Sequence, residues 1–147
     1  MQNKVNSFLL KDYKKIKFKI TKTNHLLLRV KINGIFGNFI LDTGASNSCV
    51  GFDEISLFRL MTKKSKTKAS SAGATGIETH FSENNILQIG TWKNKNFDLV
   101  VFDLSHVNLA LIEHQTKSIH GIIGSDVLIT SKAIINYENC FLYLKNK

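Results

Sequence analysis

The early part of the chain alternates between apolar and polar residues in a way that predicts antiparallel β-strands. Apolar side chains occupy every second position over 16–20 and again over 26–32. A period of two turns one face of a strand toward the core and the other toward solvent. Asn33-Gly34, a strong hairpin signal, then returns the chain into a third strand over 35–41. The chain therefore begins as a twisted antiparallel unit.

Short helices are expected to interrupt further strands along the rest of the chain. Helical spacing of apolar residues predicts one helix over 52–61 and another over 104–114, with Ser105 as the N-cap of the second. Ser125 would cap a third short helix over 127–129. The remaining strands are predicted over 48–50, 66–71, 77–82, 86–90, 97–102, 119–123, 133–137 and 141–144. Without a βαβ rhythm or an internal duplication, the sequence predicts a mainly β fold with two or three short helices.

Length and composition indicate one folded domain. The chain has 147 residues, of which 43% are hydrophobic, and this is enough for a core of its own. We expect residues 1–15 to form an N-terminal arm or edge segment and residues 16–147 to form a single domain. Apolar runs are too short for a membrane span, and charge interrupts the N-terminus too early for a signal peptide. A soluble, cytoplasmic protein without a membrane partner is expected, unless a leader has been removed.

Charge and cysteine content narrow the range of partners. The net charge of +9 at pH 7 is compatible with an anionic polymer as partner, and a basic binding module is the weakest of three functional readings. The lysines are widely spread, and no interleaving of basic and aromatic residues is evident along the sequence, so we expect no specific nucleic-acid partner. Cys49 and Cys140 do not make a disulfide framework. Neither they nor the histidines show metal-ligand spacing, so neither metal nor cofactor is expected.

The candidate chemistry begins where an apolar strand meets an acid. The stretch over 39–46 reads Phe-Ile-Leu-Asp-Thr-Gly-Ala-Ser and places Asp42 at the end of the apolar run. We expect the Asp42 carboxylate to be largely removed from water, and therefore held by hydrogen bonds or paired with another group. Gly44 would allow the backbone to turn tightly and bring amide groups toward that carboxylate.

A second stretch, over 119–128, must be read together with the first. It reads Ile-His-Gly-Ile-Ile-Gly-Ser-Asp-Val-Leu, and its Gly124 and Asp126 follow the Asp-Thr-Gly-Ala-Ser loop by some eighty residues. The pair resembles the retropepsin-like aspartic proteases, in particular bacterial single-domain members of the pepsin and retropepsin clan. The resemblance covers about residues 25–145 and implies a closed retropepsin-like β-barrel, with one lobe per chain.

The resemblance also implies roles for individual residues. Asp42 would be catalytic, and its supporting loop would be Thr43, Gly44, Ala45 and Ser46. Thr43 would brace the loops of two subunits, and Gly124 would let its segment pass closely behind the acid loop, with Asp126 in a structural hydrogen-bonding role. The hairpin at about 66–82 would be a flap over the substrate. Its tip residues, which we expect to touch the substrate, are Gly73, Ala74, Thr75 and Gly76.

Peptide hydrolysis by this chemistry needs two carboxylates that share a proton, so that one activates water while the other protonates the carbonyl oxygen. The chain has one Asp-Thr-Gly, so we expect a homodimer that acts as an aspartic endopeptidase on peptides or unfolded proteins. The alternative is a non-catalytic retropepsin-like module for peptide binding or assembly, favoured by the lack of an aromatic residue at the flap tip. Motifs of serine hydrolases, zinc proteases and phosphate-binding loops are missing from the sequence.

Overall fold

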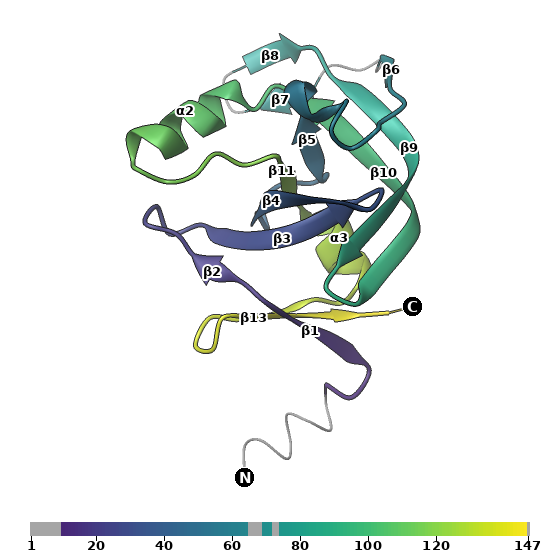
Figure 1. Ribbon diagram of the computed structural model, residues 1–147, viewed down its shortest axis with the longest axis vertical. Coiled ribbons are helices and arrows are strands. Elements are labelled where there is room, and N and C mark those ends of the chain that lie inside the picture. The colour runs from purple at the N-terminus through teal and green to yellow at the C-terminus, as the bar shows by residue number, and fades with distance from the viewer. Residues whose placement is uncertain (1–9, 65–68, 72–73, 147) are drawn as a thin grey trace.

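The chain folds mainly into strands, with short helical segments between them (Figure 1). The computed structural model describes residues 10–64, 69–71 and 74–146, and it describes side chains outside 69–77. In chain order the elements are β1 (Tyr13–Lys17), β2 (Lys19–Ile20), β3 (Leu26–Ile32), β4 (Ile35–Leu41), β5 (Cys49–Gly51), the 3₁₀ turn η1 (Phe52–Glu54), β6 (Lys63–Lys64), β7 (Ala69–Ser71), β8 (Ala74–Ile77), β9 (His80–Ile89), β10 (Trp92–Phe102), α2 (Ser105–Glu113), β11 (Gly121–Ile123), α3 (Ser125–Thr130), β12 (Ile134–Asn136) and β13 (Phe141–Lys145).

Six strands of the described chain close into a barrel in the order β3, β4, β11, β5, β10, β9, and β9 pairs back with β3. Most neighbours are antiparallel, but β11 runs parallel to β4 and β10 runs parallel to β5. The pairing of β4 with β11 aligns Leu41, the last residue of β4, with Ile123, the last residue of β11. The residues that follow these two strands therefore emerge at the same end of the barrel.

A three-stranded sheet of β1, β13 and β12 lies beside the barrel. In Figure 1 this sheet lies at the end of the molecule opposite to the β7–β8 hairpin. Its inner side contributes Ile16, Leu142 and Leu144 to the main hydrophobic cluster, and all three side chains are buried. The alternation of buried and accessible residues on β13 follows from the period of two of a strand with one face on the core.

The core explains how the apolar pattern becomes a closed barrel. Phe39 and Phe58 are fully buried and their rings lie 6.0 Å apart. A separate buried cluster joins Ile40 of β4 to Leu111 of α2 and to Ile119. Helix α2 therefore covers the outer side of the strand that leads to the candidate acid loop.

The structure confirms the expected fold class, a mainly β closed barrel with short helices. It also confirms the hairpin between the second and third predicted strands, because Ile32 pairs with Ile35 across Asn33 and Gly34. The φ angles of these turn residues are 51° and 84°. Positive φ at both central positions is the conformation that an Asn-Gly turn adopts most readily.

The helix predicted over 52–61 is wrong. Regular helical structure is limited to η1, and the chain continues through turns. Arg59 has a φ of 55°, and the Leu60 N–H donates to the Ile55 carbonyl over 3.0 Å. A left-handed residue with such a bond terminates a helix. The apolar residues of this segment, such as Phe58, instead pack into the core.

The predicted caps of the two later helices are also wrong. Leu104 and Gly124 occupy the N-cap positions of α2 and α3, while Ser105 and Ser125 are the first helical residues. The backbone N–H of Ser105 instead donates to the Asp103 carboxylate over 2.9 Å. Asp103, two residues before Ser105, therefore supplies the capping acceptor that was expected from the serine.

Within the described residues, no helix is long and apolar enough to cross a membrane.

Gly121 provides a test of how closely the barrel strands pack. A Cβ atom at this position would overlap the Cys49 carbonyl oxygen and the Phe39 ring. We expect Gly121→Ala to lower the free energy of unfolding by roughly 1–3 kcal/mol, since buried overpacking forces neighbouring atoms apart. Urea denaturation measures this change. Gly51→Ala is the matched control, because the nearest atom to its new Cβ would be 3.8 Å away. Equal losses in the two variants would contradict the prediction.

Candidate active site

Asp42 follows β4 directly and begins a tight loop. Its backbone N–H donates to the Ile123 carbonyl over 2.9 Å, and its carbonyl accepts from the Ala45 N–H over 3.2 Å. The Gly44 N–H donates to the Asp42 Oδ1 over 2.9 Å. The loop therefore turns back on the carboxylate and fixes the orientation of its side chain. We call residues 42–46 the acid loop.

The expectation that the Asp42 carboxylate is largely removed from water is wrong for the single chain. Asp42, Thr43 and Gly44 are exposed, whereas Leu41 and Ser48 on either side are buried. The physical reason is that the strand enters the core but the loop leaves it, so water reaches the carboxylate beside the Gly44 N–H. The acid loop thus presents its acid, hydroxyl and glycine on the surface of the chain.

Gly124 lies against the acid loop from behind. A Cβ atom on Gly124 would lie 2.5 Å from the Ala45 carbonyl oxygen, which is closer than a real Cβ atom can approach. The same oxygen accepts a hydrogen bond from the Ser125 N–H over 2.7 Å. The beginning of α3 and the acid loop are therefore in direct backbone contact, and only glycine fits at position 124.

Asp126 joins Ser48, which follows the acid loop, to the beginning of α3. Its Oδ1 accepts from the Ser48 hydroxyl over 2.7 Å and from the Val127 N–H over 2.9 Å, and its Oδ2 accepts from the Ser48 N–H over 2.9 Å. The Ser48 hydroxyl oxygen in turn accepts from the Gly124 N–H over 2.9 Å. We call this set of bonds the Asp126 network.

Ser48 is the member of the network that sequence reasoning missed. It is fully buried, although serine is usually exposed. Its place directly before β5, opposite an acid in the second motif, was the only signal available. A buried hydroxyl must find both a donor and an acceptor, and here Gly124 and Asp126 supply them.

The remaining predicted residues differ in where they lie. Ser46 is exposed on the acid loop, and Ala45 is partly buried beneath it. Ala74, Thr75 and Gly76 lie in β8, which pairs with β7 as a hairpin through Ser71 and Ala74. Gly73, part of the predicted flap tip, lies outside the described residues.

Cys49 follows Ser48 in the chain, and its thiol is unreactive. It is 8% exposed, and burial raises the pKa of its thiol from the ordinary value of 9.0 to about 12, with smaller contributions from the charges of Asp126 and Asp42. The thiolate is the reactive form of cysteine. Cys49 is therefore a packing residue and not a nucleophile.

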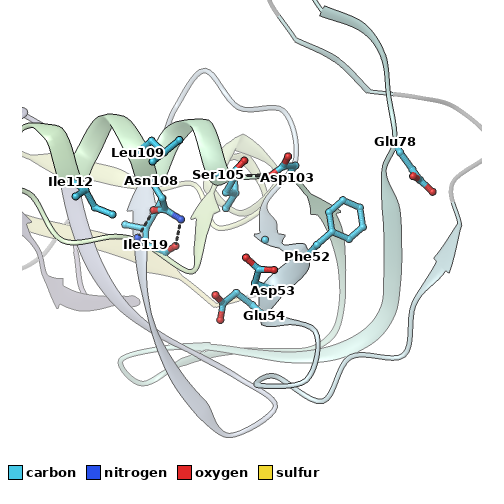
Figure 2. A pocket seen from close by; sticks show the side chains of 12 residues that line it. Phe52, Asp53, Glu54, Glu78, Asp103, Ser105, Asn108, Leu109, Ile112 and Ile119 are labelled. Carbon is cyan, nitrogen blue, oxygen red and sulfur yellow. Dashed lines mark hydrogen bonds between the residues drawn. The ribbon is translucent and has the colours of Figure 1, made fainter.

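A cavity of about 650 Å³ lies to one side, between η1 and the beginning of α2 (Figure 2). Asp53, Glu54 and Asp103 come from its two walls. Hydrogen bonds from the Ser105 backbone and side chain lower the pKa of the Asp103 carboxyl. Asp42 does not line this cavity, so the cavity is separate from the acid loop. Its lining residues are Gly51, Phe52, Asp53, Glu54, Glu78, Asp103, Leu104, Ser105, Asn108, Leu109, Ile112 and Ile119.

Comparison with known families decides the assignment of the chain. The sequence profile of the family described as aspartyl protease matches residues 28–127. The chain belongs to the aspartyl protease family. The matched range includes both the acid loop and the Asp126 network. Comparison with curated proteins gave no match.

Solved structures of aspartic proteases have the same fold. A retropepsin-like aspartic protease from Rickettsia conorii aligns with a TM-score of 0.61 and 18% identity, over 90% of this chain and 89% of that one. The retroviral protease-like domain of Ddi1 from Leishmania major aligns with a TM-score of 0.58 and 16% identity, over 84% and 90%. EIAV protease, solved with the inhibitor HBY-793, aligns with a TM-score of 0.54 and 18% identity, over 80% and 98%. The resemblance to retropepsin-like proteases is confirmed at the level of family and fold.

The Asp126 network can be tested through stability. We expect Asp126→Asn to lower the free energy of unfolding by about 1.5–3 kcal/mol, because an amide nitrogen would replace one charged acceptor and face the donors of Ser48 or Val127. Urea denaturation measures the loss. Asp53→Asn, an exposed acid in η1, is the matched control and should change stability by less than about 0.5 kcal/mol. An unchanged free energy of unfolding in Asp126→Asn would show that the network does not hold the segments behind the acid loop.

The two cysteines should differ in their reaction with a thiol reagent at pH 8. With a pKa of about 12, Cys49 has a thiolate fraction roughly a thousandfold below that of an ordinary cysteine, and it is also buried. Cys140 is partly accessible and should react first. One equivalent of the reagent should be consumed quickly, and the second should be consumed only on unfolding in urea. Comparison with Cys140→Ser assigns the two phases. Fast labelling of the native Cys140→Ser variant would contradict the prediction.

Proposed function

We propose that the protein is an aspartic endopeptidase, active as a homodimer, that hydrolyses peptide bonds through a water molecule held between two Asp42 carboxylates. The observation that carries the proposal is the acid loop. It presents an exposed carboxylate at the end of a barrel strand, oriented by the Gly44 N–H over 2.9 Å and exposed together with Thr43. Membership of the aspartyl protease family supports the same reaction class.

The chemistry explains why a second copy is needed. One group must take a proton from water while another gives a proton to the carbonyl oxygen of the peptide. Two adjacent carboxylates that share one proton can do both, because two negative charges a few ångströms apart do not ionise together easily. The chain carries one Asp-Thr-Gly, and Asp42 lies on its surface. A twofold axis beside Asp42 would bring the second carboxylate into place.

Other residues of the loop would position these carboxylates. Thr43 is exposed next to Asp42 and would form hydrogen bonds across the axis to brace the two loops. The Ala45 carbonyl accepts a hydrogen bond from the Ser125 N–H, so α3 would keep the loop in position. Gly124 and Asp126 act from behind and would not touch the substrate.

The proposed substrate is an extended chain. An extended peptide or a segment of unfolded protein would lie between the two acid loops and the β7–β8 hairpins, whose β8 strand contains Ala74, Thr75 and Gly76. Regular folded structure could not enter such a cleft without local unfolding. The chemistry requires no metal or organic cofactor.

Asp42→Asn should reduce peptide cleavage by at least about a hundredfold, because the amide cannot exchange a proton with water or substrate. The assay uses an unfolded protein and a peptide library between pH 4 and 7, with mass spectrometry of the products. Asp53→Asn, remote from the acid loop, should retain the wild-type rate. An unchanged rate in Asp42→Asn, at equal folding by circular dichroism, would disprove the assignment of the catalytic acid.

Mixing wild-type and Asp42→Asn chains tests the homodimer. If both carboxylates are required and subunits exchange freely, activity should fall with the square of the wild-type fraction. A linear fall would show that each chain acts by itself. A wild-type protein that is monomeric by sedimentation and cleaves nothing would favour the alternative, a retropepsin-like binding module.

A further inference from the structure

The outer face of the sheet formed by β1, β13 and β12 combines aromatic and basic side chains. In the antiparallel pairing of β1 with β13, Tyr13 lies opposite Lys145, Lys15 opposite Tyr143 and Lys17 opposite Phe141. Residues opposite one another in antiparallel strands share a face of the sheet. The other face carries the buried Ile16, Leu142 and Leu144. We call Tyr13, Lys15, Lys17, Phe141, Tyr143 and Lys145 the basic–aromatic face.

Contacts within this face show that the rings and ammonium groups occupy one continuous surface. The Lys15 Nζ lies 4.0 Å from the centroid of the Phe141 ring, and the Lys145 Nζ lies 5.9 Å from that of Tyr13. The rings of Phe141 and Tyr143 lie 6.4 Å apart. These three rings are only partly buried, whereas Lys15 and Lys17 are exposed.

A basic groove adjoins the face at Lys145. This groove has a volume of about 380 Å³ and contains Lys93 and Lys95 from β10 together with Lys145. None of its lining residues is acidic; the others are Trp92, Asn94, Asn96, Thr130 and Asn146. Neither β1 nor β13 carries a carboxylate, and Asp12 and Glu138 lie in the segments that flank them. An anionic chain would thus meet five lysines from three strands.

We propose that the basic–aromatic face and the adjoining groove bind single-stranded nucleic acid without sequence preference. Unstacked bases have flat faces that stack on exposed aromatic rings, and every base can do so. The phosphates between them carry the charge that Lys15, Lys17 and Lys145 complement. The interleaving that is missing along the sequence is created by the pairing of β1 with β13.

The arrangement favours a nucleic acid over an anionic membrane surface. A membrane-bound face has aromatic and aliphatic side chains that reach into the bilayer with basic groups around them. Here Tyr13, Phe141 and Tyr143 are partly buried in the sheet, and the ammonium groups of Lys15 and Lys145 lie over rings of the same face. Within the described strands of this face, Ile134 beside Tyr143 is the one exposed aliphatic side chain, which is too little apolar surface to insert into lipid.

This binding does not depend on the proposed proteolysis. The β1–β13 sheet and the β7–β8 hairpin lie at opposite ends of the molecule (Figure 1). Failure of peptide cleavage would leave the proposal intact, and failure of nucleic-acid binding would leave the proposed protease intact.

The test measures binding of the full chain to a fluorescein-labelled oligo(dT) of about 20 nucleotides by anisotropy, between about 50 and 300 mM NaCl. Wild type should bind with an affinity that falls steeply with salt. The double variant Lys15→Gln/Lys17→Gln should bind at least about tenfold more weakly, and the slope of log affinity against log salt should fall by about 1.4, or about 0.7 for each lysine. Tyr143→Leu should bind about tenfold more weakly with an unchanged slope, because it removes stacking and no charge.

Matched controls come from a similar pair elsewhere in the barrel. Arg29 and Lys31 lie 4.7 and 4.6 Å from the Phe36 ring, so Arg29→Gln/Lys31→Gln removes the same net charge, and Phe36→Leu removes an exposed ring. Both should bind like wild type. Thermal unfolding of every variant verifies that the fold is retained.

Four results would overturn the proposal. They are no binding at about 50 mM NaCl, an equal loss of affinity in the Arg29 and Lys31 control, equally tight binding of an abasic oligonucleotide of the same length, and tighter binding to phosphatidylserine vesicles than to the oligonucleotide. The second result would indicate diffuse charge alone, the third would exclude stacking, and the fourth would assign the face to a membrane surface.

Discussion

The carboxylate of Asp126 is the contact on which the arrangement of the site depends. It accepts three hydrogen bonds, two from Ser48 directly before β5 and one from Val127 in α3, and the Ser48 hydroxyl also accepts from the N–H of Gly124. Hydrogen bonds to a charged acceptor are stronger than those between neutral groups, and buried donors without a partner are costly. Among the described residues no buried side-chain nitrogen or oxygen lacks a hydrogen-bond partner, and the segments behind the acid loop are joined to one another by these bonds. The exposed Asp42 therefore lies beside a hydrogen-bonded support, although among the described residues its own carboxylate has a single amide donor.

The parallel pairing of β4 with β11 decides which segments meet at this support. It aligns the ends of two strands that are about eighty residues apart in the chain, so the acid loop and the beginning of α3 leave the barrel together. Their backbones then approach so closely that Gly124 has no room for a side chain. Two short motifs that are separate in the sequence become one structure by this single register. An aspartyl protease fold needs this proximity because catalysis depends on the position of a carboxylate to a fraction of an ångström.

The surface is divided in its chemistry. The cavity beside η1 and α2 is lined by carboxylates, including Asp53, Glu54 and Asp103, although the chain as a whole is strongly basic. The β1–β13 sheet instead carries lysines next to aromatic rings. Separation of charge on this scale produces local fields that steer charged partners to different parts of a molecule. Part of the positive charge is therefore gathered on one sheet, away from the acidic cavity.

The sequence by itself determined the mainly β class, the Asn33-Gly34 hairpin and the two family motifs, because these depend on local spacing and on residue types that few other structures need. Propensity failed where tertiary contacts decided the outcome. The segment over 52–61 ends its helical turns at Arg59, and the Asp103 carboxylate accepts from the first amide of α2, that of Ser105. Only the tertiary structure showed that Asp42 is exposed, that Ser48 completes the Asp126 network, and that lysines and aromatic rings share a face. Each of these depends on which strands become neighbours and in what register, and pairing between residues far apart in the chain leaves no periodic trace in the sequence.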